Sequence, residues 1–351
     1  MKLYKCQECG QTIFFENRLC QKCGQTLGFL ADHLKLITLR AQGGNYTPVA
    51  GEPTPLRFCR NAGRDACNWL VAANAAEDFC VACRHNRTIP DLTQGENLPR
   101  WQRMEAAKHR LFYTLIALGL KLPNFNDDPA HALTFDFLAD APGPGMKILT
   151  GHEDGLITIN LAEADDAARE QLRAQMHEPY RTLLGHFRHE VGHYFWDVLV
   201  RDSNKSPECR AVFGDERADY AKALQLYYAQ GAPADWQNNF ISAYASAHPW
   251  EDFAETWAHY LHIVDTLETA SAFGLQIHPA STSNHDLHAD INFNPHHATS
   301  IGQLVEAWLP LTFAVNNLNR SMGLPDLYPF VLSEAVIGKL GFVHELLHPG
   351  L

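Results

Sequence analysis

The stretch His189-Glu190-Val191-Gly192-His193 is an H-E-x-x-H motif. It lies among apolar residues spaced three and four positions apart, which predicts a helix from Pro179 to Val200. On a helix, residues i and i+4 share a face, so the imidazoles of His189 and His193 can bind one zinc ion. Zinc hydrolases also need a carboxylate that takes a proton from the activated water. The motif therefore predicts a catalytic zinc site with Glu190 as the general base.

Two cysteine pairs near the N-terminus have the spacing of a zinc ribbon. Cys6 and Cys9, then Cys20 and Cys23, each form a C-x-x-C-G turn. The glycine after each pair permits the positive φ that such a turn needs. Two of these turns can place four thiolates around one structural zinc ion. The alternative, a pair of redox C-x-x-C motifs, is disfavoured because no βαβ pattern accompanies them.

A second set of cysteines follows at Cys59, Cys67, Cys80 and Cys83. Only Cys80 and Cys83 have the C-x-x-C spacing, but four ligands in a short, loop-rich stretch predict a second structural zinc. The alternative that some of them are small buried hydrophobic residues stays open. Closed four-thiolate sites leave no position for a substrate, so neither zinc is expected to be catalytic.

Composition indicates a globular protein with more than one domain. The chain has 351 residues, of which 46% are hydrophobic and 19% charged. We predict a zinc-ribbon module with two four-cysteine sites over residues 1–95 and a domain that carries the H-E-x-x-H motif over 96–351. The helical periodicity of most later segments, together with the alternating strand Leu156–Asn160, predicts an α+β, mainly helical fold with a small sheet.

The N-terminus leads directly into the first cysteine pair with no apolar stretch, so no signal peptide is expected. The most apolar run, Leu111–Leu120, is too short to span a bilayer. Cysteines spaced for metal binding also suit a reducing compartment. These features predict a cytoplasmic protein without a membrane partner.

Charge is unevenly distributed along the chain. Residues 1–121 contain 16 Lys and Arg against 10 Asp and Glu, whereas residues 122–351 contain 12 against 30. The basic residues of the first part are scattered and not interleaved with aromatic ones, which argues against nucleic-acid binding. A protein partner for the zinc ribbon, or docking on the acidic part, is the favoured expectation.

Two histidines leave the catalytic zinc one ligand short. Downstream, Glu251 and Glu255 are spaced i and i+4 and therefore share one helix face. One carboxylate can bind zinc, and the other can orient a ligand histidine through its free N–H group. Asp215, which follows Gly214, is a further candidate.

The chain resembles the gluzincin metallopeptidases, in which a helix after H-E-x-x-H carries the third-ligand glutamate and an acidic residue four positions later. It is more closely similar to a bacterial family of zinc-binding metallopeptidases that join an N-terminal zinc-ribbon region to an H-E-x-x-H domain. The matching stretches are Cys6–Cys23, Thr150–Asn160, Tyr180–Tyr194, Phe213–Tyr220 and His248–His262.

The resemblance implies a zincin-like fold with Glu251 as third ligand and Glu255 as the residue that orients a histidine, with Asp215 as competitor for these roles. It also implies that Leu156–Asn160 is an edge strand, where Ile157 and Ile159 would help to bind an extended peptide. The residue that stabilises the oxyanion stays open among His248, His259, His262, Tyr260 and Tyr328.

A zinc-dependent peptidase is therefore the leading hypothesis for function. It would use one catalytic and two structural zinc ions, hydrolyse a peptide or protein substrate with a metal-activated water, and use Glu190 as the general base. The alternative is a zinc-ribbon adaptor or binding protein whose zincin half is a non-catalytic scaffold. A scaffold does not need Glu190 between the two histidines, which favours the peptidase.

Overall fold

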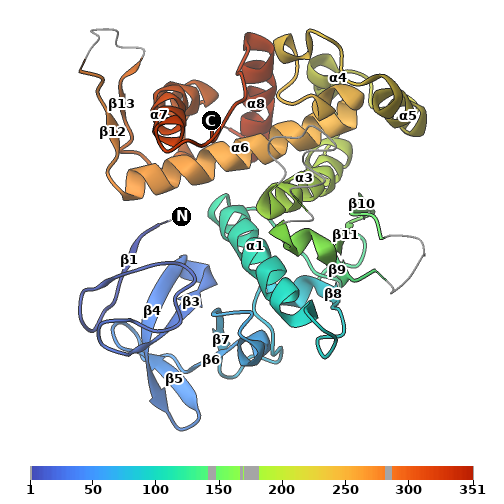
Figure 1. The fold of residues 1–351 in the computed structure, drawn as a ribbon. Helices are drawn as coiled ribbons and strands as arrows, with labels where there is room; N and C mark the ends of the chain where they lie inside the picture. Colours follow the sequence, from blue (N-terminus) through green and yellow to red (C-terminus); the bar gives the residue numbers. More distant parts are fainter. Residues whose placement is uncertain (1, 141–147, 167–168, 170–181, 281–286, 351) are drawn as a thin grey trace. The chain divides into compact units, whose positions relative to one another are not determined.

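The computed structural model describes residues 2–140, 148–166, 169, 182–280 and 287–350. The chain forms two compact units, Met1–Asp166 and Ala167–Leu351 (Figure 1). The domain boundary that the sequence predicts between residues 95 and 96 stays a prediction. The two compact units divide later in the chain, after Asp166, because the helix that follows residue 96 packs within the first unit.

The first unit begins with a two-stranded ribbon and an antiparallel sheet of five strands. The ribbon pairs β1 (Tyr4–Lys5) with β2 (Thr12–Ile13). The sheet has the order β3-β4-β5-β6-β7, with bounds Thr26–Leu30, Lys35–Gln42, Asn45–Pro48, Leu56–Phe58 and Leu70–Ala72. Aromatic rings fill its core: the Phe29 centroid lies 4.8 Å from those of Phe15 and Trp69. Edge-to-face and tilted packing of this kind stabilises beyond the buried area alone.

A second, mixed sheet and a long helix complete this unit. The sheet has the order β10-β11-β9-β8, with bounds Gly151–Glu153, Leu156–Asn160, Thr134–Leu138 and Asn86–Thr88. Helix α1 (Asn97–Ala117) buries one long face, which includes Trp101, Leu111 and Phe112. The strand expected at Leu156–Asn160 is therefore present as β11.

The expectation that Leu156–Asn160 lies at the sheet edge is wrong. β11 is interior: it pairs parallel with β9 and antiparallel with β10. The reason is local. Asp154 and Gly155 both have positive φ, 45° and 81°, as in the tight turns that a D-G pair favours in hairpins. This hairpin adds β10 outside β11, and the side chains of Ile157 and Ile159 are fully buried.

The second unit is helical. Within its described residues the helices are α3 (Leu183–Trp196), α4 (Ser206–Phe213), α5 (Tyr220–Gln230), α6 (Pro249–Ala272), α7 (Ile301–Ser321) and α8 (Glu334–Leu347). A short hairpin pairs β12 (Gln276–Ile277) with β13 (Ala289–Asp290). Helix α6 is the centre of the unit and packs against α3, α7 and α8 (Figure 1). Among the residues described, the fold is α+β and mainly helical, which confirms the predicted class.

Short helical turns connect these elements. The 3-10 turns lie at Ala31–His33, Arg60–Arg64, Cys83–His85, Leu161–Ala164, Trp236–Asn238, Tyr244–Ala247 and Pro295–His297, and a π-helical turn at Asp197–Arg201 extends α3. Thr182 caps α3 by accepting a hydrogen bond from the Gly185 N–H at 2.9 Å. The predicted start at Pro179 lies outside the described residues.

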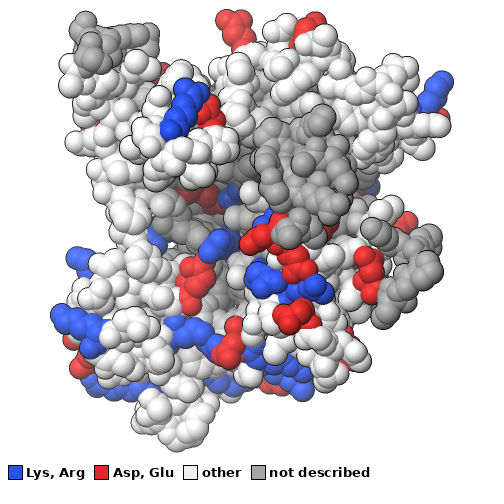
Figure 2. Space-filling view, viewed as in Figure 1, with Lys and Arg blue, Asp and Glu red and all other residues white. Residues whose placement is uncertain are grey.

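The surface charges of the first unit are mixed. Figure 2 shows Lys and Arg interleaved with Asp and Glu on the face in view. Several arginines form ion pairs, among them Arg40 with Glu8 at 3.2 Å and Arg57 with Asp78 at 3.1 Å. Among the helices described in either unit, none is both long and apolar enough to span a bilayer.

Candidate metal centre

Helices α3 and α6 approach each other closely at Gly192, the fourth residue of the H-E-x-x-H motif. A β-carbon on Gly192 would lie 3.0 Å from Ala254 Cα and 3.2 Å from Trp257 Cδ1. Ordinary Cβ contacts are longer, so only glycine fits here without a shift of the helices. This close approach brings the histidines of α3 to the carboxylates of α6.

His189, His193 and Glu251 meet between the two helices. Glu251 Oε2 lies 3.0 Å from His189 Nε2 and 3.5 Å from His193 Nε2. Their side chains are 13%, 5% and 2% exposed for His189, His193 and Glu251. Zinc bond lengths in a tetrahedral site place neighbouring N and O ligands about 3.4 Å apart. The spacing of the donor atoms therefore fits one zinc ion.

Hydrogen bonding around these donors also fits a cation. His189 Nδ1 lies 2.6 Å from Glu255 Oε1. A carboxylate oxygen accepts, so Nδ1 donates and Nε2 is directed at Glu251. Glu251 Oε2 is buried, and among the described residues it faces the Nε2 atoms of His189 and His193. A cation between Nε2 and Oε2 would satisfy both atoms.

The shifted pKa values of Glu251 and His189 indicate that the cluster attracts positive charge. Burial alone would raise the pKa of Glu251, but His193 and His189 outweigh it and hold that pKa well below its ordinary value. Burial likewise would lower the pKa of His189, but Glu251 and Glu255 raise it well above 6.5. The carboxylates draw a proton to the place where a metal ion would lie.

Glu255 and Ser242 hold the His189 ring. Burial opposes ionisation of Glu255, but its hydrogen bond with His189 lowers its pKa to about 2. The Ser242 hydroxyl donates to the other oxygen, Oε2, at 2.6 Å. Partners of this kind fix the tautomer and the orientation of a ligand histidine. Glu255 thus lies in hydrogen-bond contact with His189, as expected for the residue that orients a ligand histidine, the role that the resemblance implies.

Glu190 lies on α3 between the two histidines and is half-buried. Its pKa is raised, because burial disfavours the charged carboxylate more strongly than His189 and His193 favour it. A carboxylate with a raised pKa is a stronger proton acceptor than an ordinary surface glutamate.

Sequence reasoning missed Tyr220, the first residue of α5. Its hydroxyl donates to Glu251 Oε1 at 2.5 Å, which leaves Oε2 for the histidines. Tyr244 and Trp250 also border the cluster, with centroids 5.9 Å from the His189 ring and 4.0 Å from the His193 ring, respectively. The stretch Phe213–Tyr220 carried part of the resemblance, but its spacing from Glu251 does not reveal that the two side chains meet.

Asp215 does not join the cluster. Its side chain is 53% exposed and binds Arg217 Nη2 at 2.7 Å. It also accepts from the Arg217 N–H, so it caps a local turn. The competing roles proposed for Asp215 at the metal thus have no support in its contacts.

The candidates for oxyanion stabilisation are engaged elsewhere. His248 caps α6 by accepting from the Trp250 N–H at 3.1 Å. His259 Nδ1 lies 2.8 Å from the Tyr328 hydroxyl, and the His262 ring stacks on the Tyr328 ring. Tyr260 bonds His344 Nδ1 at 2.8 Å. All five side chains are fully or largely buried within the helical packing.

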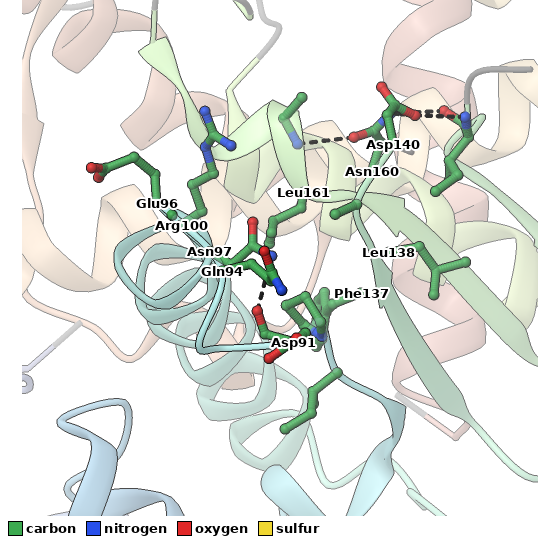
Figure 3. Close-up of a pocket in the computed structure, with 16 residues that line it drawn as sticks. Asp91, Gln94, Glu96, Asn97, Arg100, Phe137, Leu138, Asp140, Asn160 and Leu161 are labelled. Carbon is green, nitrogen blue, oxygen red and sulfur yellow. Dashed lines mark hydrogen bonds between the residues drawn. The ribbon is translucent and has the colours of Figure 1, made fainter. Parts of the chain in front are cut away.

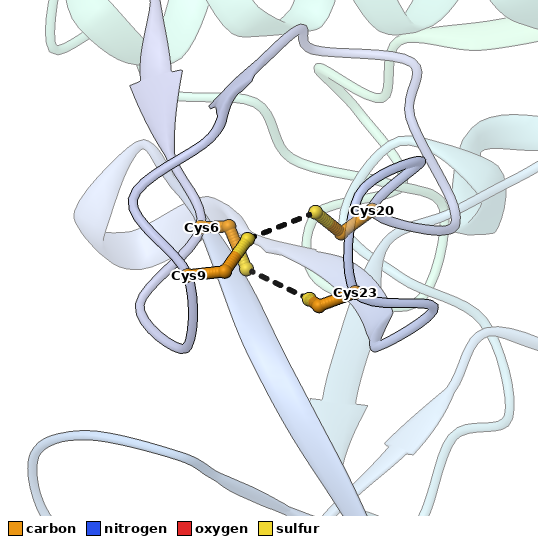
Figure 4. Close-up of side chains that lie close together, drawn as sticks. All are labelled: Cys6, Cys9, Cys20 and Cys23. Carbon is orange, nitrogen blue, oxygen red and sulfur yellow. Dashed lines mark hydrogen bonds between the residues drawn. The ribbon is translucent and has the colours of Figure 1, made fainter.

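The first cysteine set forms a compact cluster (Figure 4). Cys6 and Cys23 Sγ atoms are 3.6 Å apart, as are those of Cys9 and Cys20. Gly10 and Gly24 both have φ of +72°, as each C-x-x-C-G turn requires. The four sulfurs lie within 4.8 Å of one another, an arrangement suited to tetrahedral zinc.

The second cysteine set forms a fully buried cluster. Sγ atoms of Cys59, Cys67, Cys80 and Cys83 lie within 4.8 Å of one another. Two side chains of α1, Glu105 and His109, also reach this cluster. Sequence reasoning missed both, because no ligand spacing links a helix to cysteines so far upstream. All nine cysteines are in described residues, and none forms a disulfide.

A separate cavity of about 780 Å³ lies in the first unit (Figure 3). It is bordered by the start of α1 and the carboxyl ends of β9 and β11. Its polar side chains have partners: Asn160 Nδ2 donates to Asp140 Oδ1 at 3.1 Å within the lining, and Arg100 pairs at 2.6 Å with Asp165, which lies outside it. These contacts do not form a catalytic arrangement.

Known proteins match this chain over nearly its whole length. Residues 97–346 match the family model described as "Putative zinc-binding metallo-peptidase", and residues 3–94 match a zinc-ribbon domain. An uncharacterized protein of Mycobacterium tuberculosis is 40% identical over 347 residues, 99% of this chain and 95% of the relative. An uncharacterized protein of Mycobacterium bovis has the same identity and coverage. No solved structure matches the chain.

Proposed function

The chain belongs to the zinc-binding metallo-peptidase family that its residues 97–346 match, and we propose that it hydrolyses peptide bonds with zinc held by His189, His193 and Glu251. The observation that carries the proposal is the convergence of two imidazole nitrogens on one buried carboxylate oxygen, 3.0 and 3.5 Å away. Glu190, on the same helix, supplies the base that a hydrolase needs.

In the proposed mechanism, bound zinc would supply Lewis-acid activation of water and of the scissile carbonyl. Glu190 accepts a proton from the attacking water and delivers it to the leaving amine. The half-buried position of Glu190 supports this role, because it raises the pKa of the carboxyl group. Glu255 and Ser242 keep the His189 ring in place, and Tyr220 holds Glu251 with Oε2 toward the histidines.

The two cysteine clusters each hold one structural zinc in this proposal, so that the chain carries one catalytic and two structural ions. We propose that the zinc-ribbon module recruits a protein partner; on the face in view in Figure 2, Lys and Arg are interleaved with Asp and Glu and form no basic patch of the kind that nucleic acid needs. We place the protein in the cytoplasm, where a reducing environment keeps thiols available for metal.

The direct test compares wild type with Glu190→Gln. Zinc would be counted by elemental analysis, and hydrolysis followed on a mixed library of fluorogenic peptides. We expect Glu190→Gln to retain its zinc and to lose activity by roughly 10²–10⁴, the weight of a general base. Glu208→Gln, at an exposed glutamate of α4, is the matched control and should keep full activity.

Two results would contradict the proposal. Full activity in Glu190→Gln would remove this residue from the chemistry. A zinc-loaded wild type that cleaves no peptide in the library would favour the alternative of a non-catalytic scaffold.

A further inference from the structure

The segment between α5 and α6, residues 231–248, reaches the zinc donors from outside the two main helices. All of it is described, and its regular elements are two short 3-10 turns, Trp236–Asn238 and Tyr244–Ala247. Ser242 donates to Glu255 Oε2 at 2.6 Å, and the Tyr244 ring centroid lies 5.9 Å from that of His189. A segment with so little secondary structure depends on contacts with the rest of the fold for its position.

Helix α8 holds this α5–α6 segment at two neighbouring carbonyl groups. Ser333 Oγ donates to the Asn238 carbonyl oxygen at 2.9 Å. Lys339 Nζ donates to the Asn239 carbonyl oxygen at 2.5 Å. The same ammonium lies 4.3 Å from the centroid of the Phe240 ring, within the range of a cation–π contact. These contacts lie just before the serine that reaches the zinc donors, so they fix the path by which the chain arrives there.

Lys339 also joins α8 to the start of α6. Its Nζ lies 2.6 Å from Asp252 Oδ2. Asp252 is 0% exposed and Lys339 7%. Separating a buried ion pair leaves each charge uncompensated, so the ammonium has no comparable alternative position. Asp252 directly follows Glu251, the proposed third ligand. One ammonium group therefore connects α8, the α5–α6 segment and the helical turn that presents Glu251.

We propose that α8 positions the zinc site through Lys339, with Ser333 as a second and weaker point of attachment. The ammonium holds the α5–α6 segment so that Ser242 meets Glu255, and Glu255 in turn orients the His189 ring. Lys339 is thus a positioning residue, which acts through other side chains and is not itself a ligand. This role rests on the zinc site proposed above and does not depend on peptide hydrolysis.

The zinc affinity of the full-length chain gives the first test. Chelator competition separates the bound zinc ions by affinity, and the ion missing from His189→Gln belongs to the histidine site. We expect Lys339→Met to bind this ion about 10–100-fold more weakly, the range for loss of a contact that supports a metal ligand. Leu340→Ala is the matched control, because it removes a buried side chain from the same helix and leaves the lysine in place. It should lower stability with zinc affinity unchanged.

Three outcomes of this comparison would contradict the proposal. Wild-type zinc affinity in Lys339→Met would show that the lysine does not position the site. An equal loss of affinity in Leu340→Ala would make the effect one of general loosening. If His189→Gln lost no zinc, the zinc site itself would be wrong, and the role of Lys339 with it.

A double-mutant cycle tests the route through Ser242. Ser242→Ala removes the hydroxyl that donates to Glu255. Because Lys339 is proposed to act through this hydroxyl, Lys339→Met should cost less zinc affinity in the Ser242→Ala background than in the wild type. Effects of independent sites add. Fully additive losses would therefore overturn the proposed route.

A third variant covers the case in which loss of the buried lysine prevents folding. Ser333→Asp removes the hydroxyl that donates to Asn238 but keeps an oxygen that can accept from the Val336 N–H at the start of α8. It should fold and should bind zinc at the histidine site more weakly than the wild type. Unchanged zinc affinity in Ser333→Asp, beside an unfolded Lys339→Met, would overturn the proposal.

Discussion

Ala254 Cα lies 3.0 Å from the point where a β-carbon on Gly192 would stand. The packing of α3 on α6 thus depends on a glycine inside the H-E-x-x-H motif. We expect Gly192→Ala to push the helices apart and to lower the free energy of unfolding by about 1–3 kcal/mol, as overpacking does. Because the metal donors come from both helices, zinc affinity at this site should fall as well. Chemical denaturation and zinc titration would measure the two effects.

Gly338→Ala in α8 is the control, because nothing lies within 4 Å of the added methyl group. That variant should be neutral or more stable, since alanine favours helix by up to about 1 kcal/mol. Equal stability of the two variants would show that α3 and α6 have room for a methyl group.

Glu251 and Glu255 should differ in their effect on zinc. Glu251→Ala removes the oxygen that faces both histidines, so the catalytic site should lose tight zinc binding. Glu255→Ala frees the His189 ring and should weaken affinity about 10–100-fold. Competition with a chelator would rank the variants, with the exposed Glu306→Ala as control. Tighter binding in Glu251→Ala than in Glu255→Ala would reverse the assigned roles.

Tyr220 should contribute to the metal site through Glu251. Tyr220→Phe removes the hydroxyl that donates to Glu251 Oε1. Zinc affinity should fall about 10–100-fold, while stability falls by only about 1 kcal/mol for the lost hydrogen bond. The same chelator competition and a denaturation curve test both values. Tyr228→Phe, at an exposed tyrosine of α5, should leave zinc affinity unchanged; an equal loss there would make the effect nonspecific.

The first cysteine cluster should lose its zinc independently of the histidine site. Cys6→Ser or Cys23→Ser is expected to reduce the zinc count by one and to unfold the N-terminal ribbon. The His189 and His193 site should stay occupied, because it belongs to the other compact unit. Elemental analysis measures the count, with Cys209→Ser as control for a cysteine outside both clusters. Loss of all zinc would show that the two units fold as one.

Local features of the fold could be predicted from sequence. H-E-x-x-H on a helix and C-x-x-C-G turns bring their side chains together within a few residues, whatever the rest of the chain does. The i, i+4 spacing likewise put Glu251 and Glu255 on one face. The D-G pair at Asp154 and Gly155 also carried a usable hairpin signal, and overlooking it led to the wrong position for β11.

Contacts between distant segments could not be predicted in this way. Tyr220 meets Glu251, and Ser242 meets Glu255, only because α5 and the turn before α6 pack beside the metal donors. His109 reaches the second cysteine cluster across more than twenty residues. No periodicity or spacing relates such pairs, and their approach is decided by tertiary packing.

The hydrogen bonds that hold the His189 ring affect which metal ion the site binds. Glu255 and Ser242 hold the imidazole through a chain of hydrogen bonds, so a cation has little side-chain ordering left to impose. Donors of this kind, two imidazoles and one carboxylate, follow the Irving–Williams series, in which copper binds more tightly than zinc. The donor types alone therefore do little to reject copper, and the metal that occupies the site is decided by the geometry that the fixed side chains impose and by which ions the surroundings keep free.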